Sequence, residues 1–313
     1  MWIHVIPHFT RFLQELELKT DEREDADSKA DRIARCLWDK YYGGEFNPAC
    51  CVRVGSYGKQ TAIRPPSDLD TLFVLPPAEY HRTEQLMGNK QSQLLQRVKA
   101  ALVETFPRTD LRADGQVILA RFQTYDVEII PAFIMQDGTY ITAHTSDGGS
   151  WRASNPVAEY QRILYADSVS AGKATHLTKM LKAWKRECSV DIKSMSLETL
   201  ACDFSTVWEH RFRTIYYYDW MVRDFFRFML PYKNGTAKIR GTNEVSPLGD
   251  SWFSKCETAY NRALKACEHE QADHPYLATE EWQKIFGKQF VGTPGPANSL
   301  PLSFLVRAMA ASR

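Results

Sequence analysis

Two aspartates at the head of an apolar segment constrain this chain more than any other feature. Asp68 and Asp70 flank Leu69 and precede the largely apolar run 71–75, which ends at Pro76. Side chains alternate between the two faces of a strand, so both carboxylates project from one face while Leu69 points into the core. The segment therefore predicts a β-strand that carries a bidentate carboxylate site on one face.

A second predicted strand supplies a third acid. In the segment 125–133, Asp126 and Glu128 share a strand face and precede Pro131, whose missing N–H indicates an edge strand or the end of a strand. Hard divalent cations such as Mg²⁺ take oxygen ligands, and in two-metal sites the ions lie about 3.5–4 Å apart and serve an in-line displacement. The pattern predicts a metal site in which either Asp126 or Glu128 joins the two aspartates.

Two further segments could hold phosphate. Gly55 and Ser56 lie between a predicted strand at 49–54 and a short turn or helix, where backbone N–H groups and a hydroxyl can meet phosphate oxygens. A predicted amphipathic helix carries Lys182 two residues before Trp184, with further lysines at 179 and 185. Each feature alone is common: a lone Gly-Ser is usually a loop, and such a lysine usually lies on a helix surface.

The combination is much more specific. Gly55-Ser56, eleven residues, Asp68-Leu-Asp70 and a later acid three residues before a proline resemble the signature of polymerase-beta-type nucleotidyltransferases. Within that superfamily, segments 55–65 and 127–133 are most similar to the cGAS/DncV-like nucleotidyltransferases of bacteria (CD-NTases), which are relatives of oligoadenylate synthetase. The resemblance continues in segments 176–185, 196–198 and 281–290, so it spans about residues 9 to 290.

The resemblance implies a role for individual residues. Gly55 and Ser56 would hold the donor triphosphate, and Lys182 would steady it. Asp68 and Asp70 would bind two Mg²⁺ (or Mn²⁺) ions, and Glu128 would bind one of them and help to deprotonate the attacking hydroxyl. The family more often has aspartate at this third position, so the longer glutamate leaves Asp126 as a rival ligand.

The expected fold is α+β, a polymerase-beta-like nucleotidyltransferase palm with a mixed sheet packed against a helical C-terminal half. Helix-period patterns dominate from residue 157 onward, and the Gly- and Ser-rich segment 137–155 is the best candidate for the crossing between the halves. We expect residues 1–150 to form the palm with N-terminal helices and residues 151–313 to form the helical substrate-binding half. The segment 292–299 is typical of a loop or linker.

The charge balance restricts the partners. The chain has 39 basic and 38 acidic residues, a net charge of +1, so no global field would draw it onto long nucleic acid or an anionic membrane. Its seven cysteines, an odd number that includes the pair Cys50-Cys51, differ from the even set of a secreted disulfide framework and indicate a reducing cytosol. No run reaches the roughly 18 apolar residues of a membrane helix. We expect a cytoplasmic protein without a leader sequence.

The resemblance also implies a product. An enzyme of this kind joins nucleoside triphosphates, with pyrophosphate release, into a cyclic di- or trinucleotide second messenger that a separate effector reads during bacterial anti-phage signalling. A protein or a small molecule could activate it. Two alternatives stay open: a nucleotidyltransferase that tails RNA or modifies a small molecule or protein, and a catalytically silent sensor or scaffold. Three acids kept close together argue against the silent protein, since buried like charges are costly without a function.

Overall fold

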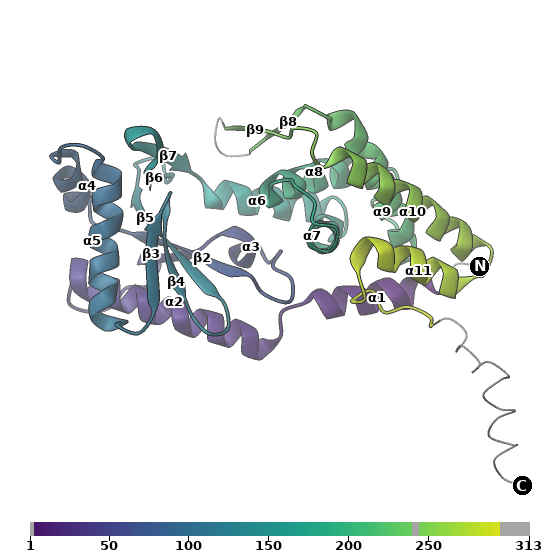
Figure 1. Ribbon diagram of the computed structural model, residues 1–313, viewed down its shortest axis with the longest axis horizontal. Helices are drawn as coiled ribbons and strands as arrows, with labels where there is room; N and C mark the ends of the chain where they lie inside the picture. The colour runs from purple at the N-terminus through teal and green to yellow at the C-terminus, as the bar shows by residue number, and fades with distance from the viewer. Residues whose placement is uncertain (1–2, 240–243, 295–313) are drawn as a thin grey trace, which may run out of the picture.

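The computed structural model describes residues 3–239 and 244–294. A mixed sheet with helices on one side lies beside a larger group of helices (Figure 1). We call the first the sheet unit (strands β1–β7 with helices α2–α5) and the second the helical unit (helices α1 and α6–α11). The expected α+β fold is confirmed.

The sheet unit is built around two parallel strands that lie next to each other although a long stretch of chain separates them. The strand order is β1-β2-β5-β4-β3, with β6 paired to β5 and β7 paired to β6, and only β2 and β5 are parallel. The strands are β1 (Cys51–Arg53), β2 (Asp68–Val74), β3 (Asp110–Asp114), β4 (Val117–Arg121), β5 (Asp126–Ile134), β6 (Tyr140–His144) and β7 (Ser150–Ser154). Its helices are α2 (Thr20–Tyr41), α3 (Gly55–Gly58), α4 (Pro77–Glu84) and α5 (Lys90–Thr105).

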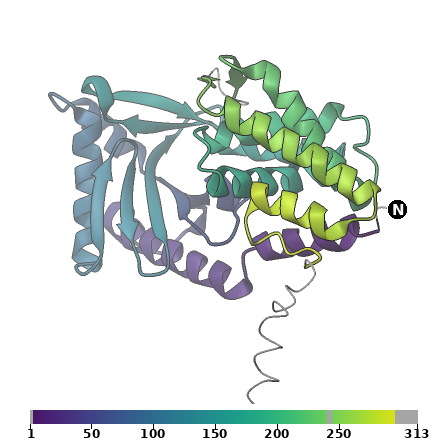
Figure 2. The same ribbon diagram turned by 45° about the vertical axis from the view of Figure 1, so that its right-hand side comes forward.

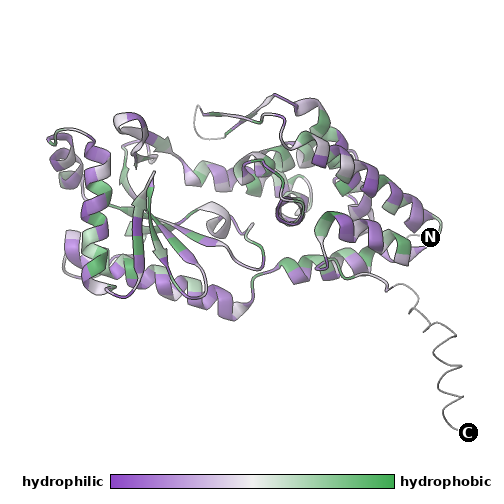
Figure 3. Cartoon of the chain, viewed as in Figure 1, coloured by the Kyte–Doolittle hydropathy of each residue, from purple (hydrophilic) through white to green (hydrophobic). Residues whose placement is uncertain are grey.

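The two faces of the sheet differ in what covers them. Leu69, Phe73, Val127 and Ile129 belong to a core that includes the apolar stripes of α2 and α5. The alternate residues of β2 and β5 therefore lie on the opposite face, and these include the predicted acids. Figure 3 shows hydrophobic colour over much of the strands and hydrophilic colour over much of α2.

The helical unit has its own core, and the first helix of the chain completes it. Phe9 and Phe12 of α1 pack against Trp282, Phe286 and Phe290. The helices are α1 (Val5–Leu16), α6 (Pro156–Ser168), α7 (Lys173–Glu187), α8 (Ser194–Val207), α9 (Tyr218–Met229), α10 (Phe253–Gln271) and α11 (Pro275–Phe286), with a hairpin of β8 (Thr236–Lys238) and β9 (Val245–Pro247). Figure 2 shows α1 lying with the C-terminal helices while α2 runs beneath the sheet. The sequence pattern did not indicate this separation of α1 from α2.

Two local expectations need correction. Pro131 marks neither an edge nor a strand end but lies inside β5. Along β5 the pairing with β4 reaches Ile129 and the pairing with β6 starts at Ala132, so the antiparallel partner changes at Pro131. A residue without an N–H is tolerated there because neither antiparallel neighbour needs its donor. The segment 137–155 contains β6 and β7, which extend the same sheet, and the chain passes to the helical unit only at the end of this segment, between Ser154 and Pro156.

The domain boundary at residue 150 stays a prediction. The last strand of the sheet ends at Ser154, and α6 begins at Pro156 with Asn155 accepting a hydrogen bond from the Ala158 N–H. Most of the expected C-terminal loop, residues 295–299, lies outside the described residues. Within the described ranges, none of the helices combines the length and apolar content that crossing a membrane would require.

Candidate active site

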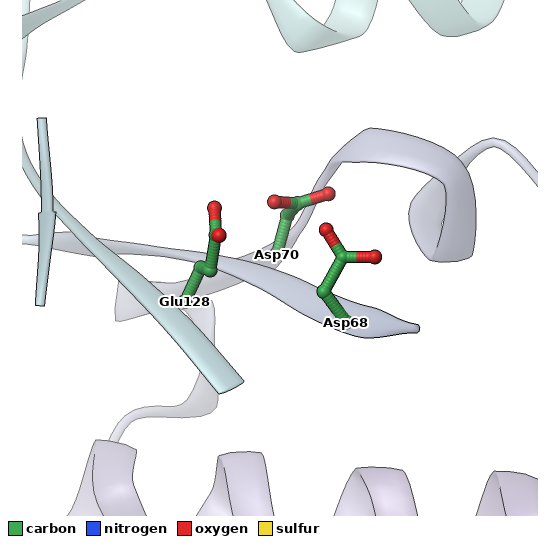
Figure 4. Close-up of side chains that lie close together, drawn as sticks. All are labelled: Asp68, Asp70 and Glu128. Carbon is green, nitrogen blue, oxygen red and sulfur yellow. The ribbon is translucent and has the colours of Figure 1, made fainter. Parts of the chain in front are cut away.

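Three carboxylates meet on the face of the sheet that α2 and α5 do not cover. Asp70 lies opposite Glu128 in the parallel register of β2 and β5, and Asp68 lies one side-chain repeat earlier on β2. One ligand oxygen from each residue lies within 4.8 Å of the other two. Figure 4 shows the three side chains pointing to the same side of the two strands. In the part of the chain that the structure describes, no other group of three potential metal ligands comes together.

The third carboxylate of this group is Glu128 and not Asp126. Asp126 lies opposite Asp68 in the register of β2 and β5. Its carboxylate faces the guanidinium of Arg121, with 3.8 Å between Oδ2 of Asp126 and Nε of Arg121. Glu128 reaches the aspartate pair because β5 brings it directly beside Asp70. The geometry favours Glu128, whose role as a ligand stays a prediction.

The electrostatics show that negative charge is crowded here. Burial, and then the neighbouring Asp68, raise the pKa of Asp70 to about 6. Burial, followed by Asp70 and Asp68, raises the pKa of Glu128 to about 7. A divalent cation would relieve this repulsion, and a set of carboxylate oxygens is the donor type that Mg²⁺ and Mn²⁺ prefer. The three side chains therefore fit a divalent metal site.

Gly55 lies directly against the carboxylate of Asp70. It follows β1, has a φ of +58°, and a Cβ added to it would lie 1.7 Å from Oδ2 of Asp70. The backbone beside it is tied to the same strand, because the Val54 N–H donates to the Asp70 carbonyl at 3.0 Å. Only glycine combines this φ with this approach, so the turn at Gly55 and Ser56 is fitted against Asp70.

A cavity of about 700 Å³ opens between the sheet unit and the helical unit at this point. Its size is within the range of about 300–1,000 Å³ that is usual for small-molecule sites. Residues that border it include Gly55, Ser56 and Asp70 from the sheet unit and Lys182, Lys185 and Glu198 from the helical unit. The segments singled out from the sequence thus come together around one space.

The three lysines of α7 differ in their surroundings. Lys182 borders the cavity and donates to the carbonyl and the hydroxyl of Thr61, both at 3.0 Å. Burial lowers the pKa of Lys182 to about 8, against the opposing effect of the Glu198 carboxylate. Lys185 also borders the cavity, whereas Lys179 is buried in an ion pair with Glu17. Lys179 is therefore not a candidate for binding triphosphate.

Sequence reasoning missed a network of ion pairs in the wall of the cavity. Lys59 forms ion pairs with Glu198 of α8 at 2.6 Å and with Glu159 of α6 at 3.0 Å. Glu198 also accepts a hydrogen bond from the Thr61 hydroxyl at 3.2 Å. Lys59 and Glu198 both lie in segments that resemble the family, but no spacing rule pairs residues from such distant parts of a chain.

Exchanging the two rival acids for amides should separate their roles. Glu128→Gln is expected to lower turnover by about a hundredfold or more, because it removes one of the three negative charges that would hold the metal. The turnover of Asp126→Asn should stay within about threefold of the parent. Pyrophosphate release at saturating triphosphate measures both, with thermal unfolding as the control for folding. A larger loss in Asp126→Asn would make Asp126 the third ligand.

Comparison with known proteins agrees with this geometry. Residues 3–164 match the family model of the second messenger oligonucleotide or dinucleotide synthetase domain. A probable cyclic nucleotide synthase of Bacillus cereus (strain VD146) is 21% identical over a 316-residue alignment, gaps included, that covers 85% of this chain and 93% of the relative.

Two solved structures share the fold. Vibrio cholerae DncV cyclic AMP-GMP synthase, in complex with nonhydrolyzable GTP, superposes with a TM-score of 0.70 at 13% identity, covering 91% of this chain and 96% of that one. CdnC of E. coli MS115-1, in its complex with HORMA-deltaN, superposes with a TM-score of 0.63 at 16% identity, covering 91% and 98%.

Proposed function

Because the chain belongs to the second messenger oligonucleotide or dinucleotide synthetase family, we propose that it joins nucleoside triphosphates into a cyclic di- or trinucleotide and releases pyrophosphate. The observation that carries the proposal is the meeting of Asp68, Asp70 and Glu128, of which the two aspartates border the cavity, with the Gly55-Ser56 turn fitted against Asp70. A site of this kind suits phosphoryl transfer, where catalysis depends mainly on positioning and on neutralising charge.

Each part of the site has a task in this reaction. Divalent ions held by the carboxylates would supply charge neutralisation and lower the pKa of the attacking ribose hydroxyl. Ser56 borders the cavity beside the acids, where its hydroxyl can bind phosphate oxygens of the donor. Lys182 enters from the other side and offers the triphosphate a positive charge. In this proposal the α-phosphate of the donor would lie next to Asp70.

We infer a role in bacterial anti-phage signalling, in which a separate effector reads the product. CdnC, which shares this fold, is known in a complex with HORMA-deltaN, and this supports a protein activator for the present chain. A small-molecule activator would serve equally well. The net charge of +1 supports synthesis that does not depend on long nucleic acid, since each phosphate contact needs a cation.

Product analysis tests the proposal. The protein is incubated with the four labelled triphosphates and Mg²⁺ or Mn²⁺, treated with phosphatase, and the products are identified by mass spectrometry. We expect phosphatase-resistant products no longer than a trinucleotide, with no requirement for added DNA or RNA. A ladder of linear oligomers, or label on a macromolecule, would favour the tailing or modifying enzyme. Full activity only with duplex nucleic acid would contradict the account of activation.

A further inference from the structure

Two lysines and two glutamates share a small volume in the wall of the cavity, which Lys59, Lys182 and Glu198 border. Lys59 and Glu198 are 6% and 7% exposed, and their side chains form an ion pair at 2.6 Å. Glu159 contacts the other side of the Lys59 ammonium at 3.0 Å, and Lys182 reaches the same Glu198 only through Thr61, whose hydroxyl contacts both. The four charges cancel, which lets Lys59 and Glu198 be buried.

The two lysines of this group differ in their partners. Lys59 has two carboxylate partners, whereas within residues 3–239 and 244–294 Lys182 makes no ion pair and donates only to the carbonyl and hydroxyl of Thr61. Of the charged groups around Lys182, the Glu198 carboxylate does most to raise the pKa of this lysine against the effect of burial. Glu198 is therefore the carboxylate that would take the Lys182 ammonium if its own partner were missing.

We propose that Lys59 is a positioning residue that occupies Glu198 and thereby keeps the Lys182 ammonium available for the triphosphate of a nucleotide. The inference rests on the proposed function, because it assumes that Lys182 binds triphosphate. A lysine that is already paired with a carboxylate must give up that partner to bind phosphate, and so it binds more weakly. Lys59 removes this competition before the nucleotide arrives.

The same ion pairs hold the turn that borders the donor site. Lys59 follows Gly55 and Ser56 in a single helical turn, and the N–H groups of Thr61 and Ala62 both donate to the Ser56 carbonyl at 2.8 and 3.0 Å. A change at Lys59 could therefore act by loosening the turn instead of by freeing Glu198. The test has to separate these two effects.

Two double variants of equal charge separate them. Lys59→Met with Glu198→Gln and Lys59→Met with Glu159→Gln each remove one cation and one anion, and each loses the ion pairs of Lys59. They differ only in which glutamate stays charged. Lys59→Met alone gives the largest charge imbalance, and the two double variants keep the test valid if that single variant does not fold.

The readouts are the KM for triphosphate from pyrophosphate release and the Kd for a nonhydrolyzable triphosphate. Lys182→Ala should raise both by about tenfold or more, in line with a hydrogen bond to a charged group. Lys59→Met with Glu159→Gln should raise them nearly as much, with kcat changed less than KM. Lys59→Met with Glu198→Gln should recover most of the lost affinity. Arg162→Met, which breaks the ion pair with Asp203 that also joins α6 to α8, is the matched control and should stay within about twofold.

The outcomes distinguish the inference from the proposed function. Equal losses in the two double variants would overturn the role of Glu198 and assign Lys59 to holding the turn. Losses in neither double variant, with Lys182→Ala impaired, would also overturn the inference while leaving the proposed function intact. A parent protein that does not bind triphosphate, or a Lys182→Ala variant with unchanged KM and Kd, would refute the assumption on which both rest.

Discussion

Asp70→Asn is expected to lower product formation by about a thousandfold or more while the protein stays folded. Asp70 is the central carboxylate of the group, since it lies beside Glu128 and shares its strand face with Asp68. Loss of one charged ligand should weaken metal binding and misplace the bound triphosphate, and both effects lower the rate. Asp68→Asn should behave in the same way. Pyrophosphate release measures the loss, and near-normal turnover by either variant would refute the metal assignment.

A stability measurement on the same variant does not depend on activity. The pKa of Asp70 is about 6 in the folded protein against an ordinary value of 3.8, so folding disfavours its ionised form. In metal-free buffer, this contribution to the free energy of unfolding is largest below pH 4 and is lost as the pH rises through about 6. Asp70→Asn should therefore unfold a few degrees higher than the parent at pH 7.5 in the presence of a chelator.

Bound metal should reverse the order of the two Tm values. Mn²⁺ or Mg²⁺ bound only to the folded state raises the Tm of the parent, whereas Asp70→Asn should show a much smaller rise. Asp126→Asn, which changes a carboxylate outside the group, is the control and should respond to metal as the parent does. Equal metal-induced shifts in all three proteins would place the ion elsewhere.

Gly55→Ala is expected to reduce turnover by about a hundredfold or more through a single methyl group. The added Cβ would lie 1.7 Å from Oδ2 of Asp70, so either the carboxylate or the phosphate-binding turn has to move. A displacement of about 1 Å at the reacting groups is enough to cost about a hundredfold. The turn cannot accommodate the change by a local adjustment because Val54 is hydrogen bonded to the backbone of Asp70.

Gly44→Ala is the matched control for this substitution. Gly44 has a similar positive φ of +68°, but a Cβ there would meet nothing within 4 Å. Both variants therefore carry the strain of a left-handed alanine, about 1 kcal/mol, and only Gly55→Ala carries the clash with Asp70. Steady-state turnover and thermal unfolding of the two variants give the comparison. Equal turnover in both would mean that the contact between Gly55 and Asp70 has no catalytic importance.

The sequence predicted the acidic strand well because its information is local. The period-two alternation of Asp68, Leu69 and Asp70 specifies which face each side chain occupies, and the same rule applies to Glu128. The choice between Glu128 and Asp126 could not be made in this way. It depends on the register between β2 and β5 and on the position of Arg121, and neither follows from the pattern of a single strand.

The errors have the same origin. The missing N–H of a proline is a local property that predicts a strand end, whereas the exchange of β4 for β6 beside Pro131 is a property of the whole sheet. The glycines and serines of segment 137–155 favour a crossing over its whole length, whereas most of the segment forms the two short strands β6 and β7. Pairing with β5 stabilises these strands, so tertiary contacts override a weak local preference.

The ion-pair network in the wall of the cavity could not be predicted from the sequence, for a further reason. Lys59 resembles any lysine of a polar loop, and Glu198 resembles any acid in the first half of a helix. Their importance comes from burial and from the meeting of α6, α8 and the turn after β1, which only the folded chain brings together.

The most direct test of the central claim is the position of the metal. A crystal of the full chain with Mn²⁺ and a nonhydrolyzable triphosphate, measured at the manganese absorption edge, locates the ions without reference to activity. The account predicts anomalous peaks bounded by the carboxylates of Asp68, Asp70 and Glu128, with the triphosphate between the Gly55-Ser56 turn and Lys182. Manganese bound away from these carboxylates, or a triphosphate bound outside this cavity, would contradict it.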